Sequence, residues 1–179
     1  AAFYGPKLDI QIKNVHGKED TLITIQIDQM LAEKFGMEYV DKDGTKKNPY
    51  IIHRTSIGCY ERTLALLIEK YAGALPTWMA PVQVRMLPIG DEQVAYCEEI
   101  ERKLIGLGVR CEIDKRNETI GYKLRNAQLE KLPYMLVVGA KEVESNTVAV
   151  RSRKEGEKGA MSPDQFISEL LLEIAEKRR

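Results

Sequence analysis

The chain has 179 residues, 44% of them hydrophobic, which suits one domain or two small ones and argues against disorder. Its 27 basic and 27 acidic residues cancel, which argues against a protein that binds nucleic acid mainly through net positive charge. A local basic face is compatible with this balance. The three cysteines form no CxxC pair, which predicts a reducing, cytoplasmic compartment. No apolar stretch reaches the ~18–20 residues that a membrane span needs, so we expect no membrane partner.

The first 55 residues are typical of antiparallel strands. Residues 7–13 and 23–28 alternate apolar and polar side chains with a period of two, so each strand has one apolar and one polar face. The polar face is either exposed to solvent or the floor of a ligand site. A short helix is expected at 29–36, a hairpin turn at 41–44 and a further strand at 50–54.

A helix is predicted over residues 57–72, where one apolar stripe holds Ile57, Tyr60, Leu64, Leu67, Ile68 and Tyr71. On another face, Gly58 and Ala65 lie one turn on either side of Arg62, which leaves room for a flat group against the guanidinium. Two prolines between residues 74 and 81 then break the pattern, and this stretch is the candidate domain boundary.

The rest of the chain alternates strands with helices, which predicts a mostly parallel sheet covered by helices. We expect strands at 82–88, 109–113, 134–138 and 147–153, the last of them antiparallel. Helices are expected at 92–107, at 119–131 and from Pro163 to about residue 177, the last one capped by Ser162. Residues 151–158 are interpreted as a charged loop.

The most informative segment is 51–62. An apolar run ends in His53 and Arg54, a polar turn follows, and the next helix carries Glu61 and Arg62 in its first turns. This is the layout of one wall of a nucleotide pocket. The chain also begins without Met, carries no signal-peptide pattern and enters a strand almost at once, so we expect a piece of a longer protein.

Six segments, in order, closely resemble bacterial threonyl-tRNA synthetases, a family of class II aminoacyl-tRNA synthetases. They are AFYGPKLD (2–9), TIQID (24–28), HRTSIGCYER (53–62), PTWMAPVQV (76–84), RNETIGYK (116–123) and PYMLVVG (133–139). The resemblance covers nearly the whole chain. It implies that residues 1–80 are the C-terminal part of a catalytic domain, an α+β fragment with an antiparallel sheet. Residues 81–179 would then be an α/β anticodon-binding domain with a mixed, mostly parallel sheet.

The implied activity is threonine–tRNA ligation, in which ATP with Mg²⁺ activates threonine, which is then transferred to its tRNA. The implied partners are threonine, ATP, this tRNA and, for the full-length enzyme, a second subunit in a homodimer. Only the last signature motif of class II synthetases lies in this chain. We therefore expect the 179-residue chain alone to be catalytically incomplete.

Four residues match positions of the family's catalytic site, and a fifth, Gln26, is predicted for the pocket from its strand face. Arg62 matches the arginine that lies against the adenine and near the γ-phosphate, a role that suits a planar cation. Tyr4 and Lys7 match positions that line the pocket for substrate and nucleotide, and Gln26 shares a strand face with other polar residues, which favours a nucleotide-pocket role. Cys59 stands where many relatives have a serine beside the substrate.

Alternatives remain at this site. Arg62 could be a solvated surface arginine, and Glu61 could orient Arg62 or the tRNA end, or be an ordinary helix charge. Thr21 stands where some relatives have a glutamine near the ribose, which puts its role in doubt.

His53 matches one of three protein ligands to a zinc ion that reads the amino and hydroxyl groups of threonine, a distinction that apolar fit makes poorly. The other two ligands have no counterpart here, because Cys59, Cys97, Cys111 and His16 do not match their positions. We therefore expect this chain not to bind zinc stably. Without the resemblance, a single histidine at a strand end is more often structural.

Four residues match positions that contact anticodon bases, namely Asn117, Lys131, Glu142 and Arg151. Unpaired bases of RNA loops are read on their hydrogen-bonding edges by such side chains. A modest basic rim for phosphates is expected from Arg116, Lys123, Arg125 and Lys141. Each could instead be an ordinary surface charge, and Asn117 could be a turn residue or helix cap.

Two other functions remain open. One is a non-catalytic tRNA-binding or regulatory paralogue of the synthetase. The other is a generic nucleotide-binding α/β protein, which would show no preference for threonine tRNA.

Overall fold

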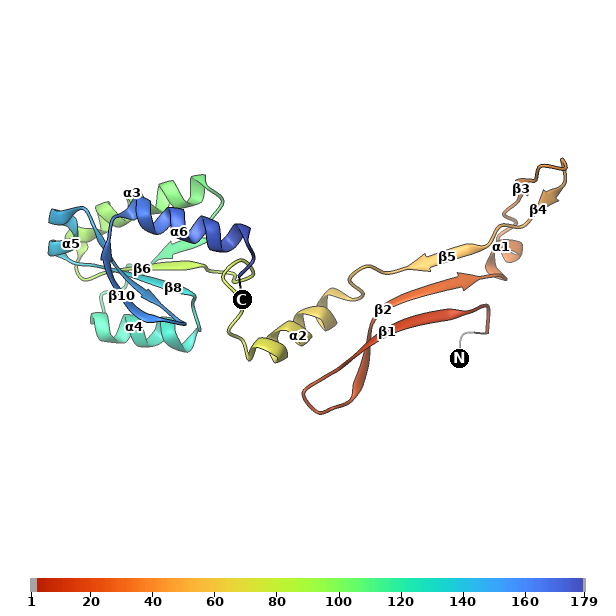
Figure 1. Cartoon of the computed structure of the whole chain (residues 1–179), viewed down its shortest axis with the longest axis horizontal. Coiled ribbons are helices and arrows are strands. Elements are labelled where there is room, and N and C mark those ends of the chain that lie inside the picture. The colour runs from red at the N-terminus through yellow and green to blue at the C-terminus, as the bar shows by residue number, and fades with distance from the viewer. Residues whose placement is uncertain (1–2, 179) are drawn as a thin grey trace. The chain divides into compact units, whose positions relative to one another are not determined.

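The computed structural model describes residues 3–178, so Ala2, which opens the first segment of the resemblance, lies outside it. The chain divides into two compact units, Ala1–Tyr71 and Ala72–Arg179 (Figure 1). Each unit has its own sheet.

The first unit is built on a three-stranded antiparallel sheet in the order β1-β2-β5. Its elements are β1 (Lys7–Lys13), β2 (Glu19–Asp28), α1 (Leu31–Lys34), β3 (Tyr39–Val40), β4 (Lys46–Lys47), β5 (Ile51–Arg54) and α2 (Tyr60–Tyr71). β3 and β4 pair around the turn predicted at 41–44. The alternating pattern therefore predicted the antiparallel strands of this unit.

Helix α2 begins three residues later than predicted, because Gly58 has a φ of +76° and lies outside the helix. A Cβ at Gly58 would lie 2.2 Å from the carbonyl oxygen of Leu22, so the backbone passes very close to β2 here. The predicted apolar stripe of α2 is largely exposed, with Tyr60 77% and Leu64 52% accessible.

The second unit has a five-stranded mixed sheet in the order β10-β9-β8-β6-β7. Its strands are β6 (Val84–Pro88), β7 (Cys111–Ile113), β8 (Tyr134–Val138), β9 (Val148–Ser152) and β10 (Gly156–Met161). The first three are parallel to one another, and the last two pair antiparallel. The expected α/β class, mixed sheet and antiparallel ninth strand are confirmed.

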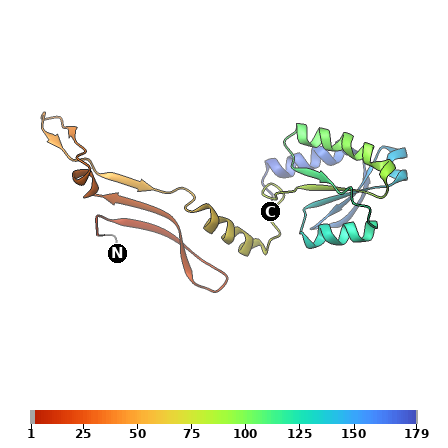
Figure 2. The same cartoon turned by 180° about the vertical axis from the view of Figure 1, so that it is seen from behind.

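Helices cover both faces of this sheet. They are the 3₁₀ turn η1 (Asp91–Gln93), α3 (Val94–Gly106), α4 (Ile120–Leu129), α5 (Ala140–Ser145) and α6 (Pro163–Ala175). Helices α3 and α6 pack on one face and α4 on the other, as both views show (Figure 1 and Figure 2). Thr119 caps α4 and Ser162 caps α6 through hydroxyl groups that accept backbone N–H bonds, as predicted for α6.

Two elements were not predicted from the sequence. The charged loop expected at 151–158 is wrong, because β9 ends at Ser152 and β10 begins at Gly156, which makes a hairpin. Residues 156–160 are all exposed, so β10 lacks the alternating pattern that marks a half-buried strand. Helix α5 is only six residues long, too short for a helical stripe.

The segment that follows α2 makes its polar contacts within the second unit. The guanidinium of Arg110 donates to the carbonyl oxygens of Ala80 and Trp78, each at 3.0 Å. Arg153 donates to the carbonyl oxygen of Leu75 at 2.7 Å. A functional boundary after residue 80 stays a prediction. In residues 3–178 no helix has the length and apolar character that crossing a membrane requires.

Candidate functional site

Three of the residues predicted for the catalytic pocket form one row across the sheet of the first unit. Lys7 on β1 lies opposite Gln26 on β2, and Gln26 lies opposite His53 on β5. Directly opposed residues of antiparallel strands point to the same face, with Cβ atoms ~5 Å apart. An ammonium, an amide and an imidazole are therefore neighbours on the polar face of this sheet.

Gln26 is the buried member of this row. It is only 6% exposed, and its Nε2 has no hydrogen-bond partner among the residues that the structure describes. An unpaired buried donor is costly and is rare in folded proteins. This amide is therefore a group that a bound polar molecule would satisfy.

His53 is held by a buried carboxylate. Its Nε2 lies 3.1 Å from Oδ2 of Asp28, whose side chain is fully buried. The other carboxylate oxygen accepts the amides of Met30 and Leu31, each at 2.9 Å. Burial alone would raise the pKa of Asp28, but these amides and the His53 ring together hold that pKa below its ordinary value.

A zinc site needs three or four protein ligands. Within residues 3–178, no group of three or more His, Cys, Asp or Glu side chains is arranged to hold a metal ion. The donors present around His53 therefore do not make a zinc site, and His53 could supply only one of its ligands.

Arg62 joins α2 to β2 instead of standing free. Its Nη1 donates to the carbonyl oxygen of Thr21 at 2.8 Å. The cavity beside it has a volume of about 70 Å³ and is also lined by Ala65 and Leu66. Pockets for drug-sized ligands are several times larger, ~300–1,000 Å³. This cavity is lined by Ala65 but not by Gly58, which lies before α2, so room for a flat group between these two residues stays a prediction.

The last two predicted catalytic residues lie near the ends of this sheet. Cys59 is exposed and its thiol donates to Oε2 of Glu61 at 2.7 Å, which lowers the pKa of Glu61. Glu61 thus contacts Cys59, whereas Arg62 contacts β2. Tyr4 is half-buried, and its carbonyl oxygen accepts the amide of Gln29 at 2.9 Å, which extends the pairing of the first strand beyond β1.

In the second unit, two predicted anticodon residues lie at the edge where the parallel strands end. Asn117 is in the loop after β7, and Glu142 is in α5, just after β8, with the end of β6 between them. Ligands of open α/β sheets bind at this carboxyl edge. Asn117 is exposed, whereas Oε2 of Glu142 accepts the amide of Gly139 at 2.9 Å and caps its own helix.

The other two lie toward the opposite end of the sheet. Lys131 follows α4, just before β8, and its ammonium donates to the carbonyl oxygen of Ala72. Arg151 lies opposite Met135 near the start of β8 and forms an ion pair with Glu157 of β10. The four residues therefore do not form one cluster, but Asn117 precedes α4, Lys131 follows it and Arg151 lies along it.

A groove runs beside α4, between this helix and the β9–β10 hairpin. It consists of two cavities of about 400 and 300 Å³, both lined by Arg151 and Glu157. Its other walls combine apolar residues, Leu124, Leu132, Met135, Val137 and Ala149, with the polar residues Gln128, Ser152 and Arg153. Sequence reasoning missed this groove because one wall, β10, was expected to be a loop.

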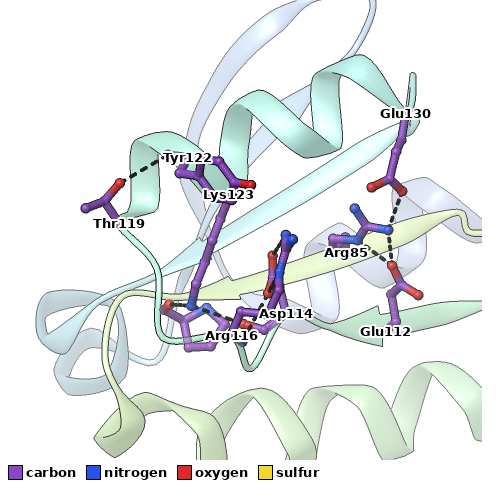
Figure 3. A network of polar contacts seen from close by, with 9 residues as sticks. Arg85, Glu112, Asp114, Arg116, Thr119, Tyr122, Lys123 and Glu130 are labelled. Carbon is purple, nitrogen blue, oxygen red and sulfur yellow. Dashed lines mark hydrogen bonds and ion pairs between the residues drawn. The ribbon is translucent and has the colours of Figure 1, made fainter.

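A polar network surrounds the start of α4 (Figure 3). Lys123 is only 4% exposed, and its Nζ donates to the carbonyl oxygens of Pro88 at 3.0 Å and Asp114 at 3.1 Å. The prediction that Lys123 belongs to a basic phosphate rim is therefore wrong, because α4 turns this side chain toward the sheet. Arg116 donates to both carboxylate oxygens of Asp114, at 2.8 and 2.6 Å, and lies 5.8 Å from the ring of Tyr122.

A second cluster lies toward the other end of α4. Arg85 of β6 is 8% exposed and forms ion pairs with Glu112 of β7 and Glu130 just beyond α4. Figure 3 shows the guanidinium between the two carboxylates. Because these groups face one another and not the groove, their role is to hold the helix to the sheet.

Comparison with known proteins agrees with this division of the chain. Residues 83–173 match the family described as anticodon binding domain, and residues 1–71 match the tRNA synthetase class II core domain (G, H, P, S and T). The two sheets and these two matches define the class: a segment of a class II aminoacyl-tRNA synthetase core followed by an anticodon-binding domain.

Individual relatives indicate which amino acid this class of synthetase handles in proteins similar to the chain. The chain is 66% identical over 177 residues to a threonine–tRNA ligase of Clostridium perfringens (strain SM101 / Type A), which covers 99% of this chain and 28% of that protein. It is 63% identical over 179 residues to one of Clostridium botulinum (strain Eklund 17B / Type B), again 28% of that protein's length. By the match over residues 83–173 the chain belongs to the family of anticodon-binding domains, and over nearly its full length it is similar to threonine–tRNA ligases.

A solved structure supports the same assignment. The RNA binding domain of threonyl-tRNA synthetase from Cryptosporidium parvum Iowa II superposes with a TM-score of 0.81 at 35% identity, over 96% of this chain and 44% of that one. The chain thus spans well under half of the curated relatives that it matches.

Proposed function

We propose that the second unit binds the anticodon loop of threonine tRNA. The observation that carries this proposal is the arrangement around α4, with Asn117 before the helix, Lys131 after it and Arg151 in the groove beside it. A groove lined by both apolar and polar side chains suits bases that are splayed out of a loop. The family match over residues 83–173 supports the same function.

The first unit supplies, in this proposal, one wall of the aminoacylation site of a longer protein. Lys7, Gln26 and Arg62 would contact ATP or its adenylate, with Tyr4 and Cys59 beside the substrate. The unpaired amide of Gln26 supports such a contact. ATP with Mg²⁺, threonine, a zinc ion held partly by His53, a homodimer and a cytoplasmic location belong to this proposal for the whole protein.

The chain alone is proposed to form no threonyl adenylate, since its row of Lys7, Gln26 and His53 is a single wall. Footprinting of threonine tRNA with the 179-residue chain tests the binding part of the proposal. We expect protection of the anticodon loop and no protection of the acceptor end beyond background. Protection that is spread evenly over the tRNA would contradict it.

A further inference from the structure

We propose that Lys123 is a positioning residue, which sets the loop 114–119 so that Asn117 reaches an anticodon base. The inference rests on the proposed function of the second unit. Lys123 is buried and is not one of the four residues that are expected to contact anticodon bases.

Lys123 joins three parts of the fold at one point. It lies in α4, and its Nζ donates to Pro88 at the end of β6 and to Asp114 directly after β7. Its own amide donates to the carbonyl oxygen of Thr119, the residue that caps α4. The ammonium therefore ties the ends of two neighbouring parallel strands to the helix that follows.

Burial of an ammonium is unfavourable, because the loss of water is only partly offset by two carbonyl groups and the nearby carboxylate of Asp114. An apolar side chain of similar length would avoid that cost but would leave the carbonyl oxygens of Pro88 and Asp114 without this donor. The same two bonds fix the backbone at the ends of two strands, so Lys123 has a geometric role beside satisfying these acceptors.

The loop is fixed link by link from Lys123 to Asn117. The amide of Asp114 donates to Met86 at 2.9 Å, and its carboxylate accepts both the amide and the side chain of Arg116. The carbonyl oxygen of Arg116 accepts the amide of Glu118 at 2.9 Å. Asn117 lies between these two fixed residues and is itself exposed, so its direction depends on the anchored ends of the loop.

This arrangement predicts that loss of the Lys123 ammonium weakens the discrimination between anticodon bases more than it weakens overall tRNA binding. In Lys123→Met, the carbonyls of Pro88 and Asp114 lose their shared donor, and Asn117 samples more directions. Discrimination against a tRNA with the substituted base should fall by about tenfold, the value of one well-placed hydrogen bond. Contacts made by Arg151 in the groove should stay, so residual binding is retained.

A double-mutant cycle on the 179-residue chain tests this inference. Dissociation constants are measured for Lys123→Met, Asn117→Ala and the double variant, with threonine tRNA and with anticodon-substituted tRNAs. We expect both single variants to lose discrimination at the same base and the double variant to be no worse than either. Combination of Lys123→Met with Arg151→Ala should instead be additive.

Additive effects of Lys123→Met and Asn117→Ala, or full discrimination by Lys123→Met, would overturn the inference. If Asn117→Ala binds every tRNA as the unaltered chain does, the proposed recognition of a base by Asn117 fails. That result differs from a failure of the positioning role of Lys123, so the two can be distinguished. Lys103→Met is the matched control, because Lys103 is exposed and pairs with Asp164 at 3.3 Å. Far-UV circular dichroism checks folding, and Lys123→Gln, which keeps amide donors on a shorter side chain, replaces the methionine variant if that one unfolds.

Discussion

Gln26 lies directly opposite His53 in the β2–β5 pairing, on the sheet face that Lys7 also shares. His53 in turn contacts the buried carboxylate of Asp28. The polar face of this sheet is thus the more buried one near its centre, whereas apolar residues on the other face, such as Ile52 at 67% exposure, are open. The burial of Gln26 and Asp28 favours the interpretation of this face as the floor of a ligand site, which stays a prediction.

Asp28 should stabilise the first unit through the two backbone amides that its carboxylate accepts at the start of α1, as well as through His53. Asp28→Ala removes the acceptor for the amides of Met30 and Leu31, whereas Asp28→Asn keeps one oxygen for them. We expect faster amide hydrogen exchange at both residues in the alanine variant and a smaller change in the asparagine variant. Equal exchange in both variants would contradict this role of the carboxylate.

Gly58 should tolerate no side chain. A Cβ there would lie 2.2 Å from the carbonyl oxygen of Leu22, and φ is +76°. Gly58→Ala should lower the free energy of unfolding by roughly 1–3 kcal/mol, measured by urea denaturation. The matched control is Gly106→Ala at the end of α3, where no atom lies within 4 Å of the added Cβ and a change of less than about 1 kcal/mol is expected.

Arg153 should hold the segment that follows α2. It donates to the carbonyl oxygens of Leu75 and Lys131, and desolvation by burial lowers its pKa. In Arg153→Ala we expect cleavage by a nonspecific protease at residues 72–76 to become roughly tenfold faster, because local opening is easier. Arg102→Ala is the control, since Arg102 is exposed and donates within its own helix, to the carbonyl oxygen of Glu98. Equal cleavage rates in the two variants would contradict this role.

Asp114 should make stability depend on pH. The hydrogen bond from Arg116 is the main cause that holds its pKa below the ordinary value of 3.8, burial opposes this, and Lys123 adds to the lowering. A carboxyl with a lowered folded-state pKa contributes stability that is present above 3.8 and is lost as pH falls through the folded value. Asp114→Asn should therefore flatten the fall in unfolding free energy below about pH 4. An unchanged pH profile would contradict this assignment.

The sequence predicted the antiparallel first sheet and the alternating strands and helices of the second unit, because these elements carry regular patterns. Strand β8 has the predicted bounds, Tyr134–Val138. Strand β10 was missed because it is held by backbone pairing with β9, while its glycines and charges follow no period.

The candidate site was predicted only residue by residue. Lys7, Gln26 and His53 were each singled out, but the register that aligns them cannot be read from three separate strands. Burial of Lys123 left a signal, since it lies on the helical stripe of Ile120 and Ala127, which faces the sheet.

The central claim is that the second unit reads the anticodon of threonine tRNA. The most direct measurement is the dissociation constant of the 179-residue chain for this tRNA and for the same tRNA with one anticodon base replaced, at one salt concentration. We predict binding at least about tenfold weaker for the replaced base, in line with ~1–3 kcal/mol per base contact. Equal affinity for both tRNAs would contradict the claim.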